Sequence, residues 1–393
     1  MSKNKNHNPE TTVVHSGREP EKNFGVVNPP VYHASTILFE TFQDFKKAEE
    51  GRLERAAYGR HGTQSYRLFE ESLCAIIGSE KCLITNSGLN AIAITLTALL
   101  TPGDHILIVD STYSPTRFFA DQELKRFGVE VEYYAPGIGA GISKLIKKNT
   151  KVIYCESPGS LTFEVEDIPA IVKCAHEKNA LVVLDNTWAT PLFFDAVKHG
   201  VDISIHSATK YIGGHSDLMM GIISCSEKLF PTLKRSYKNF GIISGPDDIY
   251  LAQRGLRTLP TRLKAHEKAA LDIAHWLKNQ PQIARVLHPA LPDCPGHELW
   301  KRDFTGSSGL FSFVLKKHLD EATLGKFLDN LQLFKMGYSW GGFESLIIPV
   351  WAEKIRSVEK FKPEGTAFRV SIGLENVDDL KADLANGLSA LKN

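Results

Sequence analysis

The sequence predicts an α/β protein built on a mostly parallel seven-stranded sheet, with a smaller α+β domain after it. Between residues 63 and 259, short apolar runs alternate with helical stretches, which is typical of a parallel sheet covered on both faces. At 393 residues, the chain is also too long for one ordinary core. We therefore expect an N-terminal arm (1–60), an α/β domain (61–258) and a C-terminal α+β domain (259–393).

The arm is polar and contains proline, with an amphipathic patch over residues 41–50. Such a segment buries little apolar surface by itself, so we expect it to wrap a neighbouring subunit. The arm therefore indicates an oligomer.

The α/β domain contains seven strand candidates separated by helices. The strands are expected at 81–85, 105–109, 129–134, 152–156, 181–184, 203–206 and 221–224, with helices at 64–78, 89–100, 114–127 and 168–178. In the C-terminal domain, residues 311–315 and 367–372 have the pattern of strands. The last helix has Asn376 and Asp378 as capping candidates, and one face carries Leu380, Leu384, Leu388 and Leu391.

Composition narrows the class of protein. The 46 basic and 45 acidic residues give a net charge of +1, which provides no field for gathering nucleic acid or an anionic membrane. The six cysteines show neither a CxxC pair nor metal-ligand spacing, and residues 1–10 lack the apolar core of a signal peptide. We expect a cytoplasmic protein with no metal, nucleic-acid or membrane partner.

Two residues at the ends of predicted strands carry the strongest functional signal. Asp185 ends the run Leu181-Val182-Val183-Leu184, and Lys210 follows 25 residues later in Ser207-Ala208-Thr209-Lys210-Tyr211. A lysine taken alone is more often a solvated surface charge. Both residues, however, fall at the carboxyl edge of the sheet, where ligands of such folds bind. An acid against a pyridinium nitrogen and a lysine forming a Schiff base are the requirements of pyridoxal 5'-phosphate (PLP).

A phosphate site is expected where Asn86-Ser87-Gly88-Leu89-Asn90 opens a helix. Helix N-termini offer free N–H groups to anions, and Gly88 and Leu89 occupy that position. Ser207 and Thr209 can add hydroxyl donors. An ordinary helix cap is the alternative. The glycine-rich run at 137–141 has the wrong spacing for a dinucleotide loop and is interpreted as a turn.

Three further residues suit the same ligand. Tyr113 follows a strand and can stack on a planar ring, although a tyrosine packed on the sheet is an equal alternative. In the arm, Tyr58-Gly59-Arg60 offers a guanidinium for phosphate, whereas such a tripeptide is ordinarily loop surface.

Substrate recognition is expected near the end of the chain. Arg369 is a charge inside an apolar strand, so it either faces solvent or holds a carboxylate. Tyr338-Ser339-Trp340-Gly341-Gly342 can wall a pocket, although a core tryptophan beside a turn would have the same sequence.

With these residues in place, the chain resembles the family of PLP-dependent enzymes of cysteine and methionine metabolism, essentially end to end. The resemblance runs through Tyr58-Gly59-Arg60, Glu156-Ser157-Pro158-Gly159-Ser160, Asp185-Asn186-Thr187-Trp188, Ala208-Thr209-Lys210-Tyr211, Arg254-Gly255-Leu256-Arg257-Thr258-Leu259, His288-Pro289-Ala290-Leu291-Pro292 and Tyr338-Ser339-Trp340-Gly341-Gly342. It implies the type I PLP fold and a homotetramer, a dimer of dimers with shared active sites.

The resemblance also implies roles. Lys210 would hold PLP, Asp185 would pair with its ring nitrogen, and Tyr113 would stack on the ring. Gly88, Leu89, Ser207 and Thr209 would bind the phosphate, together with Tyr58 and Arg60 from the adjacent subunit. Arg369 would receive the substrate α-carboxylate, with Ser339 and Trp340 beside it.

The implied reaction is β-elimination from L-cystathionine, giving homocysteine for methionine biosynthesis. Members acting at Cγ have Asn-Pro shortly after the Ser-Pro pair and often a smaller aliphatic residue in place of Trp340. This chain has Gly159-Ser160 and Trp340. A γ-lyase or cysteine desulfhydrase on the same fold is the alternative enzyme. A PLP-binding protein without catalytic activity is the alternative outside the enzymes.

Overall fold

The computed structural model describes residues 7–391. The helices are α1 (Pro9–His15), α2 (Phe42–Glu49), α3 (Gln64–Ile77), α4 (Gly88–Leu99), α5 (Ser114–Phe119), α6 (Ile168–Glu177), α7 (Thr190–Phe193), α8 (Phe230–Asn239), α9 (Pro246–Lys278), α10 (His297–Asp303), α11 (Glu321–Asp329) and α12 (Val377–Ser389). None of them, among the residues described, combines the length and apolar character required to cross a membrane.

The large sheet has seven strands, as the sequence predicts. They are β1 (Lys81–Thr85), β2 (His105–Val109), β3 (Glu130–Tyr134), β4 (Thr150–Glu156), β5 (Leu181–Asp185), β6 (Ile203–Ser207) and β7 (Gly221–Cys225), in the order β1-β7-β6-β5-β4-β2-β3. Only β7 runs opposite to the other six strands, so it is antiparallel to both β1 and β6. The carboxyl ends of β2, β4, β5 and β6 therefore meet at one edge.

Both faces of this sheet are buried, because alternate residues of a strand point to opposite sides. Along β2, Ile106 and Ile108 pack with α4, whereas Leu107 and Val109 pack with α6. The strand is therefore apolar throughout its middle, and such a short continuous apolar run is typical of a strand buried on both faces.

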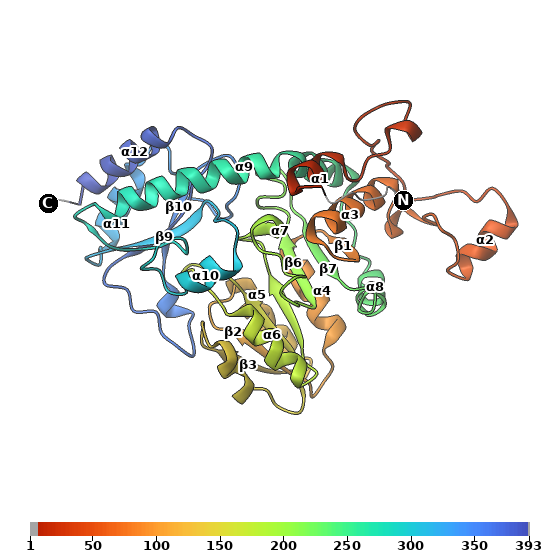
Figure 1. The fold of residues 1–393 in the computed structure, drawn as a ribbon, viewed down its shortest axis with the longest axis horizontal. Helices are drawn as coiled ribbons and strands as arrows, with labels where there is room; N and C mark the ends of the chain where they lie inside the picture. Colours follow the sequence, from red (N-terminus) through yellow and green to blue (C-terminus); the bar gives the residue numbers. More distant parts are fainter. Residues whose placement is uncertain (1–6, 392–393) are drawn as a thin grey trace.

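A second, antiparallel sheet lies beyond the first, in the order β10-β11-β9-β8. Its strands are β8 (Ile283–Leu287), β9 (Leu310–Leu315), β10 (Leu346–Val350) and β11 (Ala367–Ser371). The long helix α9 connects the two halves: its first part packs with α3, and its last part packs on the second sheet (Figure 1).

Two sequence expectations need correction in detail. The helix expected over 114–127 is divided into α5 and a π-helical turn, Ala120–Leu124. Asn376 caps α12 as predicted, accepting the N–H groups of Asp378 and Asp379. Asp378 itself is not the cap; it lies in the first turn, where a carboxylate favours the helix dipole.

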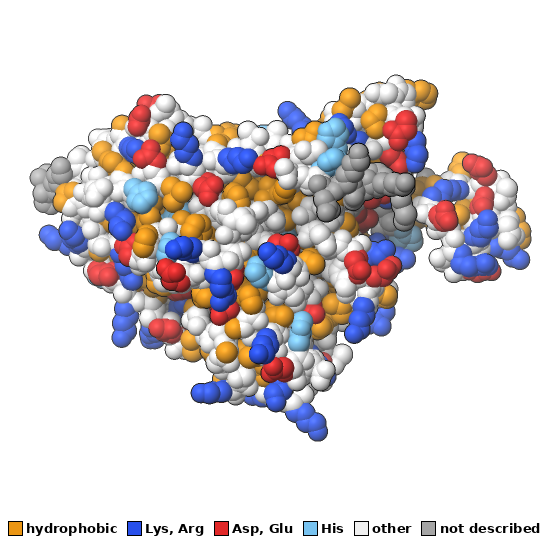
Figure 2. Space-filling model, viewed as in Figure 1, with side chains coloured by type: hydrophobic (Ala, Val, Ile, Leu, Met, Phe, Trp, Pro, Cys, Tyr) orange, Lys and Arg blue, Asp and Glu red, His pale blue; other side chains and the backbone are white. Residues whose placement is uncertain are grey.

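The two helices of the arm are placed differently: α1 packs against α3 and α9, with Val13 buried, whereas the segment around α2 projects away from the body of the molecule. Helix α2 buries none of its residues and forms the separate lobe in Figures 1 and 2. The amphipathic patch of the sequence is therefore helical but has no partner within the described part of this chain.

Candidate active site

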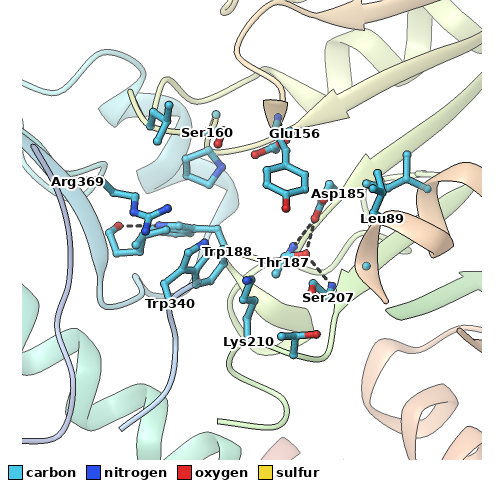
Figure 3. A pocket seen from close by; sticks show the side chains of 18 of the residues that line it. Leu89, Glu156, Ser160, Asp185, Thr187, Trp188, Ser207, Lys210, Trp340 and Arg369 are labelled. Atoms are coloured by element: carbon cyan, nitrogen blue, oxygen red, sulfur yellow. Dashed lines mark hydrogen bonds between the residues drawn. The ribbon is translucent and has the colours of Figure 1, made fainter. Parts of the chain in front are cut away.

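A cavity of about 290 Å³ opens at the carboxyl edge of the large sheet. Both halves of the chain contribute to it, as Figure 3 shows. The predicted site residues on its wall are Gly88, Leu89, Tyr113, Asp185, Ser207, Thr209, Lys210, Trp340 and Arg369. The structure thus brings together residues from the strands β5, β6 and β11, the first turn of α4 and several loops.

Lys210 lies in the turn after β6. Its Nζ donates a 2.6 Å hydrogen bond to the hydroxyl of Ser339 and lies 5.5 Å from the centre of the Trp340 ring. Burial and the nearby Arg369 guanidinium lower the pKa of Lys210 to about 8, against the opposing effect of Asp185. About a tenth of this amine is therefore uncharged at pH 7, far more than for an ordinary lysine.

Asp185 ends β5 and is fixed by Thr187. The carboxylate accepts the Thr187 N–H at 3.0 Å and the Thr187 hydroxyl, and that same hydroxyl accepts the N–H of Ser207 at 2.9 Å. Burial raises the pKa of Asp185, while the Thr187 hydrogen bonds and Lys210 oppose the rise. Thr187 therefore ties the end of β5 to the end of β6 (Figure 3).

The first turn of α4 forms a cradle suited to an anion. The Ser87 side chain caps the helix by accepting the N–H of Asn90. The N–H groups of Gly88 and Leu89, in the first turn, have no acceptor within the helix and can therefore bind an anion. A Cβ on Gly88 would lie 2.7 Å from the Cβ of Ser207, so glycine is required for this close approach. The hydroxyl of Thr209 accepts the N–H of Met220 at 2.9 Å.

Tyr113 precedes α5 at the mouth of the cavity and is 43% exposed. Its backbone N–H donates a 2.7 Å hydrogen bond to Glu156, the last residue of β4. Burial, Asp185 and Glu156 all raise the pKa of the phenol. The Tyr113 hydroxyl therefore keeps its proton at physiological pH.

Arg369 lies in the middle of β11 and reaches the cavity from the second sheet (Figure 3). Its guanidinium donates a 2.9 Å bond to the carbonyl of Ser339, and its buried Nε has no hydrogen-bond partner within residues 7–391. Burial lowers its pKa to about 10. Ser339 itself has φ of 88°, a conformation that residues other than glycine seldom adopt.

Tyr58 and Arg60 lie outside this cavity. They stand in the arm, where the guanidinium is 5.7 Å from the centre of the tyrosine ring and both side chains are exposed. Within one chain, the structure does not bring them to the other predicted site residues.

Sequence reasoning missed several residues of the cavity wall. Glu156 ends a strand just as Asp185 does, so its position was an available signal. Trp188 also lines the cavity, and its Nε1 donates to the carbonyl of Leu310 at 2.8 Å. Thr187, Ser160 and Met219 also line the cavity. Thr187 and Ser160 lie in stretches that carry the family resemblance, but neither was predicted as a site residue.

The four charged groups of the cavity share one property. Lys210, Arg369, Asp185 and Glu156 form no ion pair with any described residue. Both cations bond to the neutral Ser339, and both acids accept bonds from N–H and O–H groups. A ligand that carries charges of both signs would complete the site.

These residues fit pyridoxal phosphate. The absence of a Cβ at Gly88 lets Ser207 approach the free N–H groups at the start of α4, Asp185 offers a buried carboxyl to a ring nitrogen, and the lowered pKa of Lys210 suits bonding to an aldehyde.

Comparisons with known proteins agree with this arrangement. The chain is 44% identical to cystathionine beta-lyase of Salmonella typhimurium and 42% identical to cystathionine beta-lyase MetC of Escherichia coli, each match covering 97% of this chain and 98% of the relative. The crystal structure of metB from Corynebacterium glutamicum superposes with a TM-score of 0.90 at 30% identity, covering 98% of this chain and 99% of that one.

The match to a family extends over residues 10–389, nearly the whole chain, and the family's description includes the cofactor predicted from the sequence. This protein belongs to the family of PLP-dependent enzymes of Cys/Met metabolism.

Proposed function

We propose that this protein is a carbon–sulfur lyase that converts L-cystathionine and water into L-homocysteine, pyruvate and ammonia. Near-full-length relatives at 42–44% identity that are named cystathionine beta-lyase support the reaction. The observation that carries the proposal is the set of unpaired charges around Ser339, because an amino-acid substrate supplies the missing carboxylate. Homocysteine is a precursor of methionine, so the enzyme serves methionine biosynthesis.

Lys210 holds the cofactor in the resting enzyme and acts as the base. Bound pyridoxal phosphate supplies an electron-withdrawing ring in conjugation with the substrate Cα. The Nζ of Lys210, with its pKa of about 8, removes the Cα proton and delivers a proton to the sulfur as the Cβ–S bond breaks. Tyr113 stacks on the ring and shares in these proton transfers.

Asp185 and the α4 cradle fix the cofactor. The Asp185 carboxylate stabilises positive charge on the ring nitrogen, and Thr187 prevents the carboxylate from turning away. The N–H groups of Gly88 and Leu89 bind the phosphate with Ser207 and Thr209.

Arg369 binds the substrate α-carboxylate, with Trp340 on the cavity wall and Ser339 hydrogen-bonded to the guanidinium. By holding the carboxylate, Arg369 would fix the orientation of the Cα–H bond toward the base Lys210, as removal of the Cα proton requires. Trp340 narrows the pocket, as expected for an enzyme acting at Cβ.

The enzyme is a homotetramer, a dimer of dimers, in which Tyr58 and Arg60 reach the phosphate of the neighbouring subunit. Their exposed position in a projecting arm supports this assignment. We divide the chain into the arm (1–60), a PLP-binding α/β domain (61–258) and a C-terminal α+β domain (259–393). The six free thiols are compatible with a reducing cytoplasm.

Product analysis tests the proposal. Purified protein incubated with L-cystathionine should release pyruvate and homocysteine in equal amounts. Release of 2-oxobutyrate and cysteine would show a γ-lyase instead. A yellow protein that yields neither keto acid would be a PLP-binding protein without turnover.

A further inference from the structure

Glu156 is the one charged group of the cavity that the mechanism above does not use. It ends β4, and its register partner on β5 is Asp185. Paired residues of parallel strands point to the same face, so the two carboxyl groups lie side by side at the sheet edge (Figure 3). Glu156 has no ion pair within the described chain, and burial together with the neighbouring Asp185 raises the pKa of its carboxyl well above the ordinary value. Its place in the site therefore needs an explanation other than charge pairing.

The contacts of Glu156 are directed at the segment that carries Tyr113. Its Oε2 accepts the backbone N–H of Tyr113 at 2.7 Å and lies 3.4 Å from the hydroxyl of Thr112. Tyr113 is the residue that immediately precedes α5, after the turn that ends β2. One carboxyl oxygen at the end of the neighbouring strand β4 therefore holds the backbone of this residue.

Within residues 7–391, no other hydrogen bond occupies that N–H group. The Tyr113 carbonyl accepts the N–H groups of Thr116 at 2.9 Å and Arg117 at 3.2 Å, so the residue is joined to α5 on one side and to Glu156 on the other. Tyr113 is 43% exposed, so packing holds only part of its surface. Its position consequently depends on where its backbone is held.

Resting on the proposed function, we infer that Glu156 is a positioning residue for Tyr113, and that the length of its side chain matters more than its charge. A misplacement of about 1 Å in an active site can cost roughly a hundredfold in rate. The hydrogen bond from Tyr113 sets the ring over the cofactor, and the neighbouring Asp185 keeps its separate role.

Two near-isosteric changes separate length from charge. Glu156→Gln keeps an acceptor oxygen in place and removes the charge, so its kcat should stay within about threefold of wild type. Glu156→Asp keeps the charge but withdraws the oxygen by one methylene, so its kcat should fall about tenfold or more, with KM changed less. Retained activity in the Asp variant and loss in the Gln variant would overturn the inference.

Two further readouts exclude a merely structural role. The visible circular dichroism of the bound cofactor should change in Glu156→Asp and not in Glu156→Gln, because it reports the ring environment. In a Tyr113→Ala background, Glu156→Asp should cause no additional loss of kcat. If the loss of kcat in the double variant equals the product of the two single losses, Glu156 acts independently of Tyr113 and the assignment is refuted.

These measurements also separate this inference from the proposed reaction. If wild-type protein fails to cleave cystathionine, the reaction is wrong. The circular dichroism of the Asp and Gln variants still tests Glu156, since it needs only bound cofactor.

Discussion

In the part of the chain that the structure describes, charged side chains form ion pairs at the amino end of the large sheet but not in the cavity at its carboxyl end. At the amino end, Lys147 lies 2.6 Å from both Glu130 and Glu132. His105 lies beside them, with Nδ1 2.7 Å from the Thr150 hydroxyl and Nε2 3.3 Å from the carboxylate of Glu132. Charges at this end are neutralised by other charges of the chain.

At the carboxyl end, Lys210, Arg369, Asp185 and Glu156 are more deeply enclosed, yet they make no ion pair with one another or with any described residue. Burying a charge is costly unless hydrogen bonds or an opposite charge compensate it, and a ligand with charges of both signs would supply that partner here. Arg262 and Asp383 are also buried without an ion pair to any described residue, but backbone groups satisfy them and they do not line the cavity. The gathering of four such side chains around one cavity therefore favours the carboxyl end as the site of chemistry.

The largest effect is expected from Lys210→Ala. Loss of the group that holds the cofactor and moves the proton should lower kcat by roughly a thousandfold or more. The visible absorbance of the lysine-bound cofactor should disappear in the same preparation. Turnover retained at the wild-type level would show that another group is the base.

Asp185→Asn comes next. The amide keeps an acceptor for the Thr187 bonds but removes the charge opposite the ring nitrogen, so kcat should fall roughly a hundredfold. Asp185→Ala should cost at least as much. Steady-state rates of pyruvate release measure this effect. Equal rates for Asp185→Asn and wild type would show that the negative charge opposite the ring nitrogen comes from another residue.

Arg369→Ala should act mainly on recognition. Loss of a charged hydrogen bond to the substrate carboxylate should lower kcat/KM by roughly ten- to a hundredfold. Arg369→Lys is the matched control, because it keeps the charge and loses the planar fork. An unchanged kcat/KM in the Ala variant would place the carboxylate elsewhere.

A smaller effect concerns pH. Only the uncharged amine of Lys210 attacks an aldehyde, and its pKa is about 8. Re-attachment of cofactor to the stripped protein should therefore quicken about tenfold per pH unit below 8 and level off above it. Since Arg369 lowers this pKa, Arg369→Ala should move the midpoint upward. A midpoint near 10.5 in wild type would contradict the burial of Lys210.

Much of the fold could be predicted from the sequence, for a physical reason. Strands of a parallel sheet buried on both faces are apolar without interruption, so β2 and β5 stand out between polar turns. Because their carboxyl ends meet at one edge, the location of Asp185 and Lys210 followed from strand assignment alone.

The rest depended on contacts between distant residues. The bond from Lys210 to Ser339 joins residues 129 positions apart, and the Tyr113–Glu156 bond joins residues 43 apart. No periodicity records such pairs. The break after α5 and the positive φ of Ser339 are likewise outcomes of tertiary packing, which local propensity does not contain.

The amino end of the sheet provides the smallest predicted effect and the sharpest control. Lys147→Met removes the ammonium shared by Glu130 and Glu132, but exposed ion pairs contribute little because water and salt screen them. The melting temperature should fall by about 3 °C or less, and kcat/KM should equal the wild-type value. A large loss of turnover in this variant would show that the two ends are coupled, and the charge contrast would then no longer locate the active site.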